Sequence, residues 1–557
     1  MAKADYDAIV VGAGFTGLYM LYKLRELGLS ARVIEAGSDV GGTWYWNRYP
    51  GARCDIESME YSYSFSPELE QEWEWTERYA SQPEILHYLR HVAERFDLRR
   101  DIAFDTRVTA ACWDEGAALW AVEMDRGERL AAHYCIMGTG CLSSPNRPDI
   151  SGLGDFAGET YLTGLWPHEG VDFAGKRVAV IGTGSSGIQS IPVIAREADH
   201  VTVFQRTANF TVPAHNRPLA SEEQAAIKAG YRELRALERH SPGGVGSGPP
   251  QSLEPILATP PDELREDLER RWEIGGLGGF LNTHPDTILS AEAADRVAEF
   301  LRAKIRETVS DPDVAELLCP ASHPMGSKRL CVDTGFHATF NRENVELVDL
   351  NATPIERIAP EGVQTSEKLY PADIIVLATG FDAMTGTLAR IDIRGKGGAA
   401  LKDKWAEGPR SYLGLMCAGF PNLFTVTGPG SPSVISNMVV SIEQHVEWIA
   451  GLLAELRRCG AATVEPLAEA EDAWGEHVNA VAAPTIFMQA DSWYVGANIP
   501  GKPRVFMPYI GGVGTYRTIC EDVAAKNYAG FAVDGEASPP PADFMAYLGM
   551  AQEAEAA

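Results

Sequence analysis

The sequence predicts an α/β fold with two Rossmann-like dinucleotide-binding domains and a helical insertion in the second of them. This prediction rests on two glycine-rich turns of identical spacing, each directly after an apolar run typical of a buried strand: Gly12, Gly14 and Gly17, then Gly182, Gly184 and Gly187. In such a turn the first glycine permits the tight bend, the second lets the backbone approach a pyrophosphate, and the third lets the following helix pack closely. The N-terminal N–H groups of that helix face the anion.

The end of the second strand in each unit predicts which nucleotide it binds. In the first unit this strand ends at Glu35, whose carboxylate can accept hydrogen bonds from ribose hydroxyls, as expected for FAD or NAD. In the second unit Arg206 and Thr207 stand in its place. A guanidinium can hold a 2′-phosphate through two hydrogen bonds, whereas a carboxylate would repel it, so this site favours NADP. One such turn would also fit a plain strand-to-helix connection, but two with opposite partners indicate a flavoprotein that binds FAD and NADP(H).

Length, composition and charge restrict the class of protein. The chain has 557 residues, of which 45% are apolar, and this predicts two or three well-buried domains. Its formal net charge of −29 argues against nucleic acid and anionic membranes as partners, because both would repel such a surface. No apolar run reaches the length that spans a bilayer, and the N-terminus lacks the pattern of a secretion signal. We therefore expect a cytoplasmic protein, a monomer or a weak oligomer.

Nine cysteines without a CxxC pair argue against both a disulfide framework and a dithiol oxidoreductase. No metal site is predicted.

The order of the patterns along the chain predicts two interrupted domains. The apolar runs 135–140 and 374–380 both end in a small residue followed by Thr and Gly, and the ranges 222–238 and 291–310 have helical spacing. The predicted segments are an FAD-binding domain at 1–145 and 384–535, an NADP-binding domain at 146–214 and 331–383, a helical insertion at 215–330 and a disordered tail at 536–557.

Two further motifs resemble those of a known family. Phe156 and Gly158, followed by Trp166 and Pro167, resemble the fingerprint FxGxxxHxxxWP of type I Baeyer-Villiger monooxygenases. The segment 41–55, with the motifs GGTW and YPG and a final aspartate, is similar to a second fingerprint of that family, and 428–438 resembles its phenylacetone and steroid monooxygenase branch. The resemblance implies an enzyme that uses FAD, NADPH and O2 to convert aryl, cyclic or bulky ketones to esters or lactones through a C4a-peroxyflavin.

The resemblance also implies the roles of individual residues. Arg329 matches the active-site arginine, a cation that keeps its proton and can stabilise an oxyanion, and Asp55 matches the aspartate that orients it. Lys328 resembles a second contact to the 2′-phosphate, and Trp493 resembles a tryptophan on a mobile loop that closes over NADP and substrate. The resemblance also implies cofactor contacts by Gly42, Trp44, Asp55, Ser185, Ser186 and Gln189. It implies substrate contacts by Val434 and Met438. By residue type alone, each of these could be an ordinary surface charge or core side chain.

One position departs from the first fingerprint, because Leu162 stands where the family has histidine and the nearby His168 is out of register. In the family this histidine belongs to a linker between the nucleotide domains, and leucine cannot donate a hydrogen bond. We therefore predict slower or leakier turnover in this protein than in a Leu162→His variant. Equal rates and equal release of hydrogen peroxide in both proteins would refute this.

Two other functions remain open at this point. A flavin monooxygenase that oxidises amines or sulfides would share both glycine motifs and the use of NADPH, but would have less need of Arg329. A redox-sensing protein that binds both nucleotides without oxygenating anything would share them as well. Incubation with NADPH, air and a ketone separates the three, because only the first yields an ester.

Overall fold

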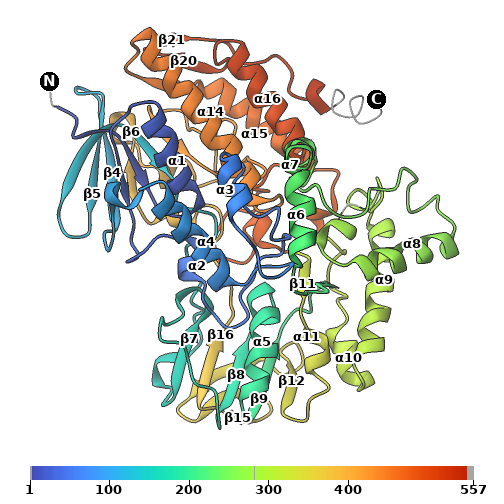
Figure 1. Ribbon diagram of the computed structural model, residues 1–557. Coiled ribbons are helices and arrows are strands. Elements are labelled where there is room, and N and C mark those ends of the chain that lie inside the picture. Colours follow the sequence, from blue (N-terminus) through green and yellow to red (C-terminus); the bar gives the residue numbers. More distant parts are fainter. Residues whose placement is uncertain (1–2, 282, 549–557) are drawn as a thin grey trace.

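The computed structural model describes residues 3–281 and 283–548, which form two lobes (Figure 1). The N-terminal segment and the C-terminal part of the chain lie together in the upper lobe of Figure 1, and the middle of the chain forms the lower lobe. Each lobe is built around its own sheet. Among the described residues, no helix is long and apolar enough to cross a membrane.

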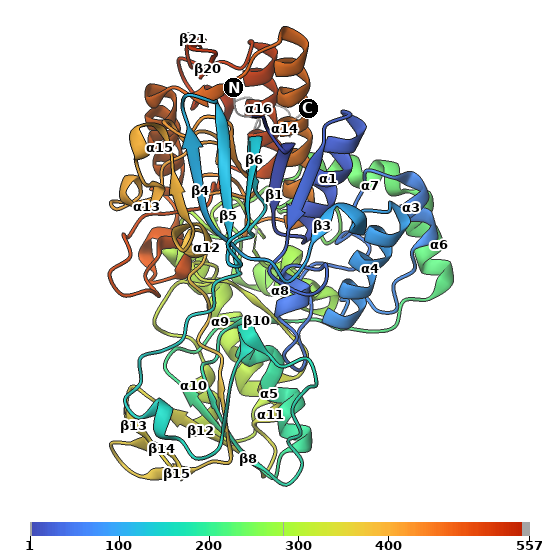
Figure 2. The ribbon, with the colours of Figure 1, turned by 90° about the vertical axis from the view of Figure 1, so that its left-hand side faces the viewer.

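The sheet of the upper lobe has the strand order β17-β4-β5-β6-β1-β2-β3, with β18 also paired to β6 (Figure 2). Strands β1, β2, β3, β6 and β18 run parallel, whereas β4, β5 and β6 pair in antiparallel fashion. Its strands are β1 (Tyr6–Val11), β2 (Ala31–Ile34), β3 (Ile102–Ala103), β4 (Val108–Asp114), β5 (Leu119–Met124), β6 (Arg129–Met137), β17 (Asp392–Arg394) and β18 (Leu423–Thr425). Strands β17 and β18 show that the chain returns to this sheet after forming the lower lobe.

Helices α1 (Phe15–Glu26) and α14 (Met438–Cys459) pack against each other in the upper lobe, so residues from the two ends of the chain share one apolar core. The other helices of this lobe are α2 (Thr43–Trp46), α3 (Pro67–Glu72), α4 (Gln82–Arg95), η1 (Arg99–Asp101), α12 (Gly386–Ala389), η5 (Lys396–Gly398), α13 (Leu401–Lys404), α15 (Ala468–Ala482), η6 (Ile486–Gln489), η7 (Trp493–Val495) and α16 (Val513–Ala525). A small antiparallel sheet contains β19 (Val464–Pro466), β20 (Phe531–Val533) and β21 (Glu536–Ala537).

The sheet of the lower lobe is parallel throughout, with the order β12-β9-β8-β16-β7. Its strands are β7 (Glu159–Leu162), β8 (Arg177–Ile181), β9 (His200–Gln205), β12 (Val345–Asp349) and β16 (Ile374–Leu377). Parallel strands that are buried on both faces read as continuous apolar runs, and β8 and β16 have this pattern. The lobe also contains η2 (Leu153–Asp155), η3 (Thr163–Leu165), α5 (Ser185–Glu197), α11 (Phe336–Thr339), β13 (Ile355–Ala359), β14 (Gly362–Thr365) and β15 (Leu369–Pro371).

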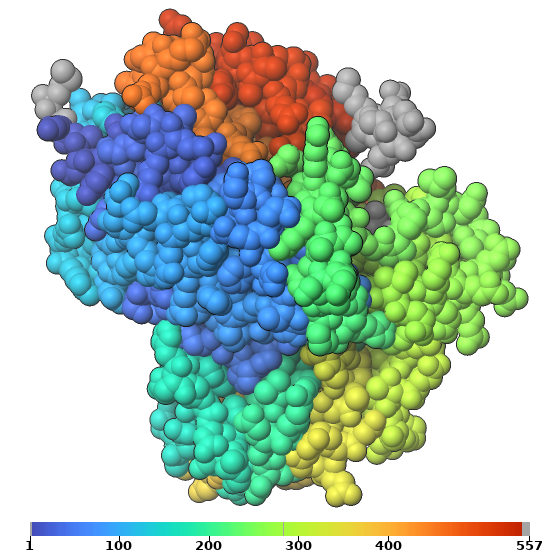
Figure 3. Space-filling view, in the orientation of Figure 1, coloured from blue at the N-terminus to red at the C-terminus, as the bar shows by residue number. Residues whose placement is uncertain are grey.

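A helical segment connects two short parallel strands, β10 (Thr211–Pro213) and β11 (Cys331–Asp333). Its described residues form α6 (Ser221–Ala229), α7 (Tyr231–His240), α8 (Pro261–Ile274), η4 (Leu277–Gly279), α9 (Ala291–Thr308) and α10 (Pro312–Leu318). Helices α6 and α7, drawn in green, lie against the blue N-terminal region in Figure 3. Arg235 of α7 donates a hydrogen bond to Glu70, and Tyr231 donates one to the carbonyl of Met59. This segment therefore bridges the lobes, and the exact domain boundaries stay predictions.

The disorder predicted for 536–557 is wrong for residues 536–548. Strand β21 pairs with β20, and Phe544 is 5% exposed, with its ring 5.3 Å from that of Trp474. The reason is that one aromatic side chain in a polar, alanine-rich segment finds an apolar site made by distant residues, which local composition does not reveal. Residues 549–557 lie outside the described part of the chain.

His445 on α14 makes the stability of the fold dependent on pH. The side chain is fully buried, and its Nδ1 atom accepts the N–H of Thr427 at 3.0 Å. Burial, and secondarily the charge of Arg517, lowers the pKa of His445 to about 3. In the unfolded chain, histidine takes up a proton near pH 6.5, whereas the buried His445 does so only near pH 3. The free energy of unfolding therefore has its full value above pH 6.5 and decreases as the pH falls from 6.5 toward 3.

We expect this one group to remove about 2 kcal/mol of unfolding free energy between pH 7.5 and pH 5. A His445→Gln variant keeps an acceptor for Thr427 but does not titrate, so its stability should fall less over that range. Urea unfolding of both proteins at pH 7.5 and pH 5 measures the difference. An equal loss in the two proteins would show that His445 does not contribute.

Candidate active site

The first glycine-rich turn joins β1 to α1 and is held by Glu35. Oxygen Oε2 of Glu35 accepts the N–H of Ala13 and Oε1 accepts that of Gly37, each at 2.7 Å. Burial raises the pKa of Glu35, and these two N–H groups oppose the rise. The carboxylate thus fixes the shape of the turn, and each oxygen keeps a further lone pair for the ribose hydroxyls expected there.

The turn residues leave space only for backbone. A Cβ on Gly17 would lie 1.8 Å from the carbonyl oxygen of Gly12, so the third glycine is required for α1 to pack against the turn. Gly42 has φ +52° and lies against Gly14. A Cβ on Gly42 would lie 2.8 Å from the Cα of Gly14. Helix α1 has no side-chain cap and no acidic residue in its first turn, so its N-terminal N–H groups are available to an anion. These features fit the pyrophosphate of FAD.

The second turn joins β8 to α5 and has the same construction. A Cβ on Gly187 would lie 2.2 Å from the carbonyl oxygen of Gly182, whereas a Cβ on Gly184 would meet no atom within 4 Å. Helix α5 also lacks a side-chain cap and acidic residues in its first turn. The space over Gly184 and the available N–H groups fit the pyrophosphate of NADP.

Two cations accompany the second turn. Arg206 is exposed at the end of β9, and Lys328 is half-buried in the segment before β11. Burial, followed by the charge of Arg206, lowers the pKa of Lys328. The charge of Asp491 opposes this shift only in part, so the two positive charges repel each other, and a bound anion such as a phosphate would relieve that repulsion. Thr207 contributes its carbonyl, which accepts a hydrogen bond from the Thr183 hydroxyl at 2.9 Å.

Several residues with a predicted cofactor contact also hold parts of the protein together. Gln189 accepts a hydrogen bond from the Tyr49 hydroxyl at 2.8 Å and donates one to the carbonyl of Arg53 at 3.0 Å, which joins α5 to the upper lobe. The indole N–H of Trp44 donates to the hydroxyl of Tyr61 at 3.2 Å. The side chains of Gln189 and Trp44 are thus engaged by the chain itself. The Ser185 hydroxyl contacts the Cys331 thiol at 3.2 Å.

Arg329 lies where three distant segments of the chain meet. Its Nη2 and Nε atoms donate to Oδ2 of Asp55 at 3.0 and 3.3 Å, and its Nη1 atom donates to the carbonyl of Val434 at 3.0 Å. The side chain of Asp55 is 10% exposed and that of Arg329 is 27% exposed. Burial raises the pKa of Asp55 and the charge of Arg329 opposes this, whereas for Arg329 burial lowers the pKa and Asp55 more than compensates. The guanidinium therefore stays charged, and one edge of it is fixed.

Val434 and Met438 contact each other beside this arginine. Val434 has φ +63°, a conformation that is strained for a β-branched residue, and it is 6% exposed. Its N–H points to the sulfur of Met438 at 3.0 Å, while its carbonyl accepts from Arg329. The strained backbone thus directs a carbonyl toward the cation. Val434 belongs to an apolar cluster that includes Met384, Phe487 and Tyr494.

Residues 9–239 match a family model described as pyridine nucleotide-disulphide oxidoreductase. The chain is 43% identical over 534 residues to a Baeyer-Villiger monooxygenase of Pseudooceanicola batsensis, covering 95% of this chain and 97% of the relative. Among solved structures, oxidised steroid monooxygenase bound to NADP matches with a TM-score of 0.91 and 52% identity, covering 95% of this chain and 99% of that one.

This chain belongs to the type I Baeyer-Villiger monooxygenases. Members of this family are FAD- and NADPH-dependent enzymes that convert ketones to esters or lactones, so the predicted enzyme class and reaction are confirmed. The α/β fold with two Rossmann domains and the two cofactors are confirmed as well. The similarity to steroid monooxygenase agrees with the predicted branch. The oligomeric state stays a prediction.

The linker around residue 162 has Leu162 where the Baeyer-Villiger monooxygenase fingerprint has histidine, and other residues of this linker contact the upper lobe. Leu162 ends β7 beside Leu377 and packs in an apolar cluster. A short distance along the chain, the carbonyl of Trp166 accepts a hydrogen bond from Arg48, and the ring of His168 lies 5.0 Å from that of Tyr45. These two contacts join the linker to the upper lobe without residue 162. The effect of Leu162→His on turnover stays a prediction.

Trp493, expected on a loop of this monooxygenase, lies in η7 and is half-buried. Its neighbour Tyr494 is 3% exposed and belongs to the same apolar cluster as Val434, whose carbonyl accepts a hydrogen bond from Arg329. Tyr494 and Cys331 are therefore site residues that the sequence did not predict, and the Cys331 sulfur lies 3.5 Å from the carbonyl of Arg329. The only signal for Tyr494 was its place next to a predicted loop residue.

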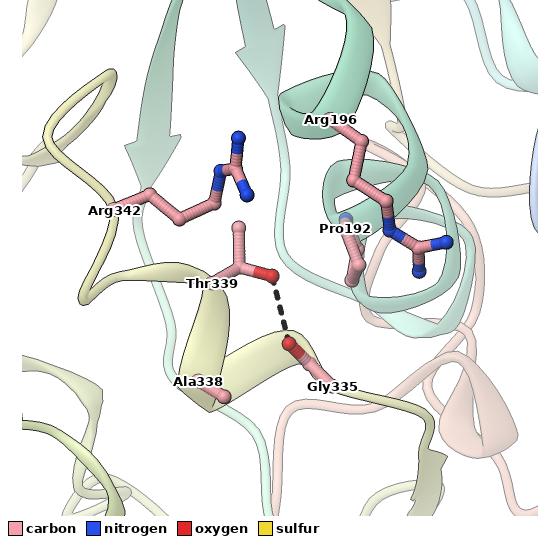
Figure 4. Close-up of a pocket in the computed structure, with 6 residues that line it drawn as sticks. All are labelled: Pro192, Arg196, Gly335, Ala338, Thr339 and Arg342. Atoms are coloured by element: carbon pink, nitrogen blue, oxygen red, sulfur yellow. Dashed lines mark hydrogen bonds between the residues drawn. The ribbon is translucent and has the colours of Figure 1, made fainter.

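A cavity of about 180 Å³ between α5 and α11 is separate from the predicted site (Figure 4). It is lined by Pro192, Arg196, Gly335, Ala338, Thr339 and Arg342. None of these residues is among those predicted to bind a cofactor or substrate. The described residues also include no group of three or more His, Cys, Asp or Glu side chains that could hold a metal ion.

Proposed function

We propose that Arg329 is the catalytic cation of this Baeyer-Villiger monooxygenase and that Asp55 orients it. The observation that carries this proposal is the fixing of one guanidinium by acceptors from two other segments, Asp55 and the carbonyl of Val434. FAD, when bound and reduced by NADPH, supplies an activated oxygen atom derived from O2. The protein must then stabilise negative charge on that oxygen and on the ketone oxygen as the new carbon–oxygen bond forms.

Arg329 suits this task because its contacts within the protein use only some of its N–H donors. A guanidinium has five N–H groups, and three of those in Arg329 donate to Asp55 and Val434. The others can donate to a developing oxyanion. Asp55 prevents the cation from turning away, so little reorganisation is needed when the charge appears.

We assign the second turn to NADP(H), with the 2′-phosphate between Arg206 and Lys328. Neither cation forms an ion pair within 4.0 Å among the described residues, although the charge of Asp491 acts on Lys328 from farther away. A phosphate would relieve their mutual repulsion. Ser185, Ser186 and the N-terminal N–H groups of α5 would then lie along the pyrophosphate.

The apolar cluster beside Arg329 supports an apolar ketone as substrate. Val434, Met438 and Trp493 belong to its surface, so an aryl, cyclic or bulky ketone would be held against hydrocarbon with its carbonyl toward the cation. We also propose that the enzyme acts in the cytoplasm as a monomer or weak oligomer. Its nine cysteines are free thiols, which supports a reducing compartment.

Oxygenation of nitrogen or sulfur is the second candidate, because a phenazine N-monooxygenase of Lysobacter antibioticus is 40% identical over 539 residues, covering 96% of this chain and 98% of that relative. The purified enzyme, with NADPH and air, should be given phenylacetone, cyclohexanone, a thioether and phenazine in separate reactions. We expect ester or lactone in amounts that match the NADPH consumed. Formation of N- or S-oxide with no ester would support the second candidate instead.

A further inference from the structure

Helix α5 presents two side chains that contact the segments on either side of the charged pair. Ser185 and Gln189 are four residues apart, so they lie on the same face of the helix, one turn from each other. Gln189 is 5% exposed, and Cys331, which Ser185 contacts, is 2% exposed. The helix lies in the lower lobe directly below the blue N-terminal region (Figure 1). One face of α5 is therefore directed at the site from below.

The Gln189 side chain holds the segment 49–55, which ends at Asp55. Its Nε2 atom donates to the carbonyl of Arg53 at 3.0 Å, and its Oε1 atom accepts from the Tyr49 hydroxyl at 2.8 Å. The backbone of the segment also lies against the helix, because a Cβ on Gly51 would be 2.2 Å from the Gln189 carbonyl oxygen. Asp55 follows Arg53 by two residues. These contacts therefore restrict where its carboxylate can lie.

The Ser185 side chain holds the segment that contains Arg329. Its hydroxyl lies 3.2 Å from the Cys331 sulfur, and that sulfur lies 3.5 Å from the carbonyl oxygen of Arg329. Cys331 also packs in the apolar core of the lower lobe together with Ile188 of α5. The backbone of Arg329 is therefore held to the same helix as the segment 49–55.

The two contacts and the ion pair close a ring. One arm leads from Gln189 to Asp55. The other arm leads from Ser185 to Arg329. The arms meet where the guanidinium donates to the carboxylate at 3.0 Å. Because both arms start on α5, a shift of this helix against either segment changes how the two charged groups face each other.

We propose that Gln189 is a positioning residue that holds the pair of Asp55 and Arg329 in register with helix α5. The N-terminal end of α5 forms the second glycine-rich turn, so the ring connects the nucleotide cradle of the lower lobe with the charged pair. The guanidinium is held in its working orientation only while α5 is docked on segment 49–55. This proposal rests on the proposed function above, in which Arg329 is the catalytic cation.

The test is a Gln189→Met variant. Methionine has a similar length and a flexible chain, but it cannot donate to the Arg53 carbonyl and is only a weak acceptor for Tyr49. We expect the ester formed per NADPH to fall about tenfold, with hydrogen peroxide rising to match. This is less than the ~100-fold that a displacement of about 1 Å can cost, because the Val434 carbonyl still holds the guanidinium. Anaerobic reduction of the flavin by NADPH should keep its wild-type rate.

Gln224→Met is the matched control. Gln224 on α6 is 6% exposed, and its amide exchanges two hydrogen bonds with the backbone of Trp75, each at 2.9 Å. It therefore joins the helical insertion to the upper lobe by the same chemistry, through partners outside the ring. We expect this variant to keep the wild-type ester yield. A similar loss in both variants would mean that any broken bridge loosens the enzyme, and the proposal would then be wrong.

A second readout does not depend on turnover. Phenylglyoxal modifies accessible guanidinium groups, and peptide mass spectrometry gives the rate at Arg329 alone in the FAD-loaded enzyme without nucleotide. We expect this rate to rise several-fold in Gln189→Met and to be unchanged in Gln224→Met. Tyr49→Phe removes only one of the two hydrogen bonds, so it should give a smaller rise, and it carries the test if Gln189→Met does not fold. A wild-type rate in both ring variants would overturn the proposal.

A double-mutant cycle with Asp55→Ala tests whether Gln189 acts through the charged pair. In the Asp55→Ala background the pair is already broken, so adding Gln189→Met should raise the labelling of Arg329 no further. An equal rise in both backgrounds would contradict the proposed route. Failure of the proposed function is distinguishable, because Arg329→Ala would then still form ester, while the labelling rates would continue to report on the ring.

Discussion

An Arg329→Ala variant is expected to lose ester formation by about 100- to 1,000-fold, the usual effect of removing an oxyanion donor. NADPH should still reduce its flavin at the wild-type rate, because the nucleotide cradles at Gly12–Gly17 and Gly182–Gly187 are built from other residues. The reason for the large effect is that Asp55 forms no other ion pair among the described residues, so the substitution would leave a buried carboxylate without its charged partner.

Anaerobic stopped-flow reduction and product analysis in air separate the two half-reactions. Arg329→Lys is the matched control, since lysine keeps the charge but cannot donate to Asp55 and Val434 together. We expect it to remain strongly impaired and to release most of its NADPH-derived electrons as hydrogen peroxide. Ester formation that survives in Arg329→Ala would show that the catalytic assignment is wrong.

The second large effect is expected at the nucleotide-selecting cation. An Arg206→Ala variant should bind NADPH about 10- to 100-fold more weakly, because a charge-assisted hydrogen bond to phosphate is worth about 1.5–3 kcal/mol. NADH lacks the 2′-phosphate, so its reduction kinetics should not change, and the preference for NADPH should fall by the same factor. Lys328 would still supply one positive charge, so a residual preference is expected.

Anaerobic flavin reduction at several concentrations of each nucleotide gives these constants. Arg196→Ala is a suitable control, because Arg196 lies on α5 of the same lobe but lines the separate cavity of Figure 4. It should leave both constants unchanged. If Arg206→Ala weakened NADH and NADPH equally, its effect would be structural, and the 2′-phosphate would have to be bound elsewhere.

The features that could be predicted from the sequence are those that local spacing requires. The two turns need glycine at fixed intervals after a strand. The charge at the end of the next strand, on Glu35 and on Arg206, is the feature from which nucleotide selectivity was predicted. The helical spacing at 222–238 and 291–310 also predicted helices, and the structure has α6, α7 and α9 in these ranges. Each of these patterns lies within a few turns of chain, where backbone geometry alone relates residue to residue.

The site itself depends on tertiary structure. Arg329 and Asp55 are 274 residues apart, and only the resemblance to a family paired them before the fold was known. Nothing local indicates that Val434 adopts a strained conformation or that Gln189 joins α5 to Arg53. The burial of Phe544 was missed for the same reason.

By itself, then, the sequence determined two nucleotide-binding units, their selectivity and the family to which the chain belongs. Only the tertiary structure decided which side chains surround the guanidinium of Arg329 and which side chains join the two lobes. The physical reason is that a turn or cap is fixed by neighbours in the chain. A buried polar contact is fixed by the packing of whole lobes, which brings donors and acceptors together at any separation in sequence.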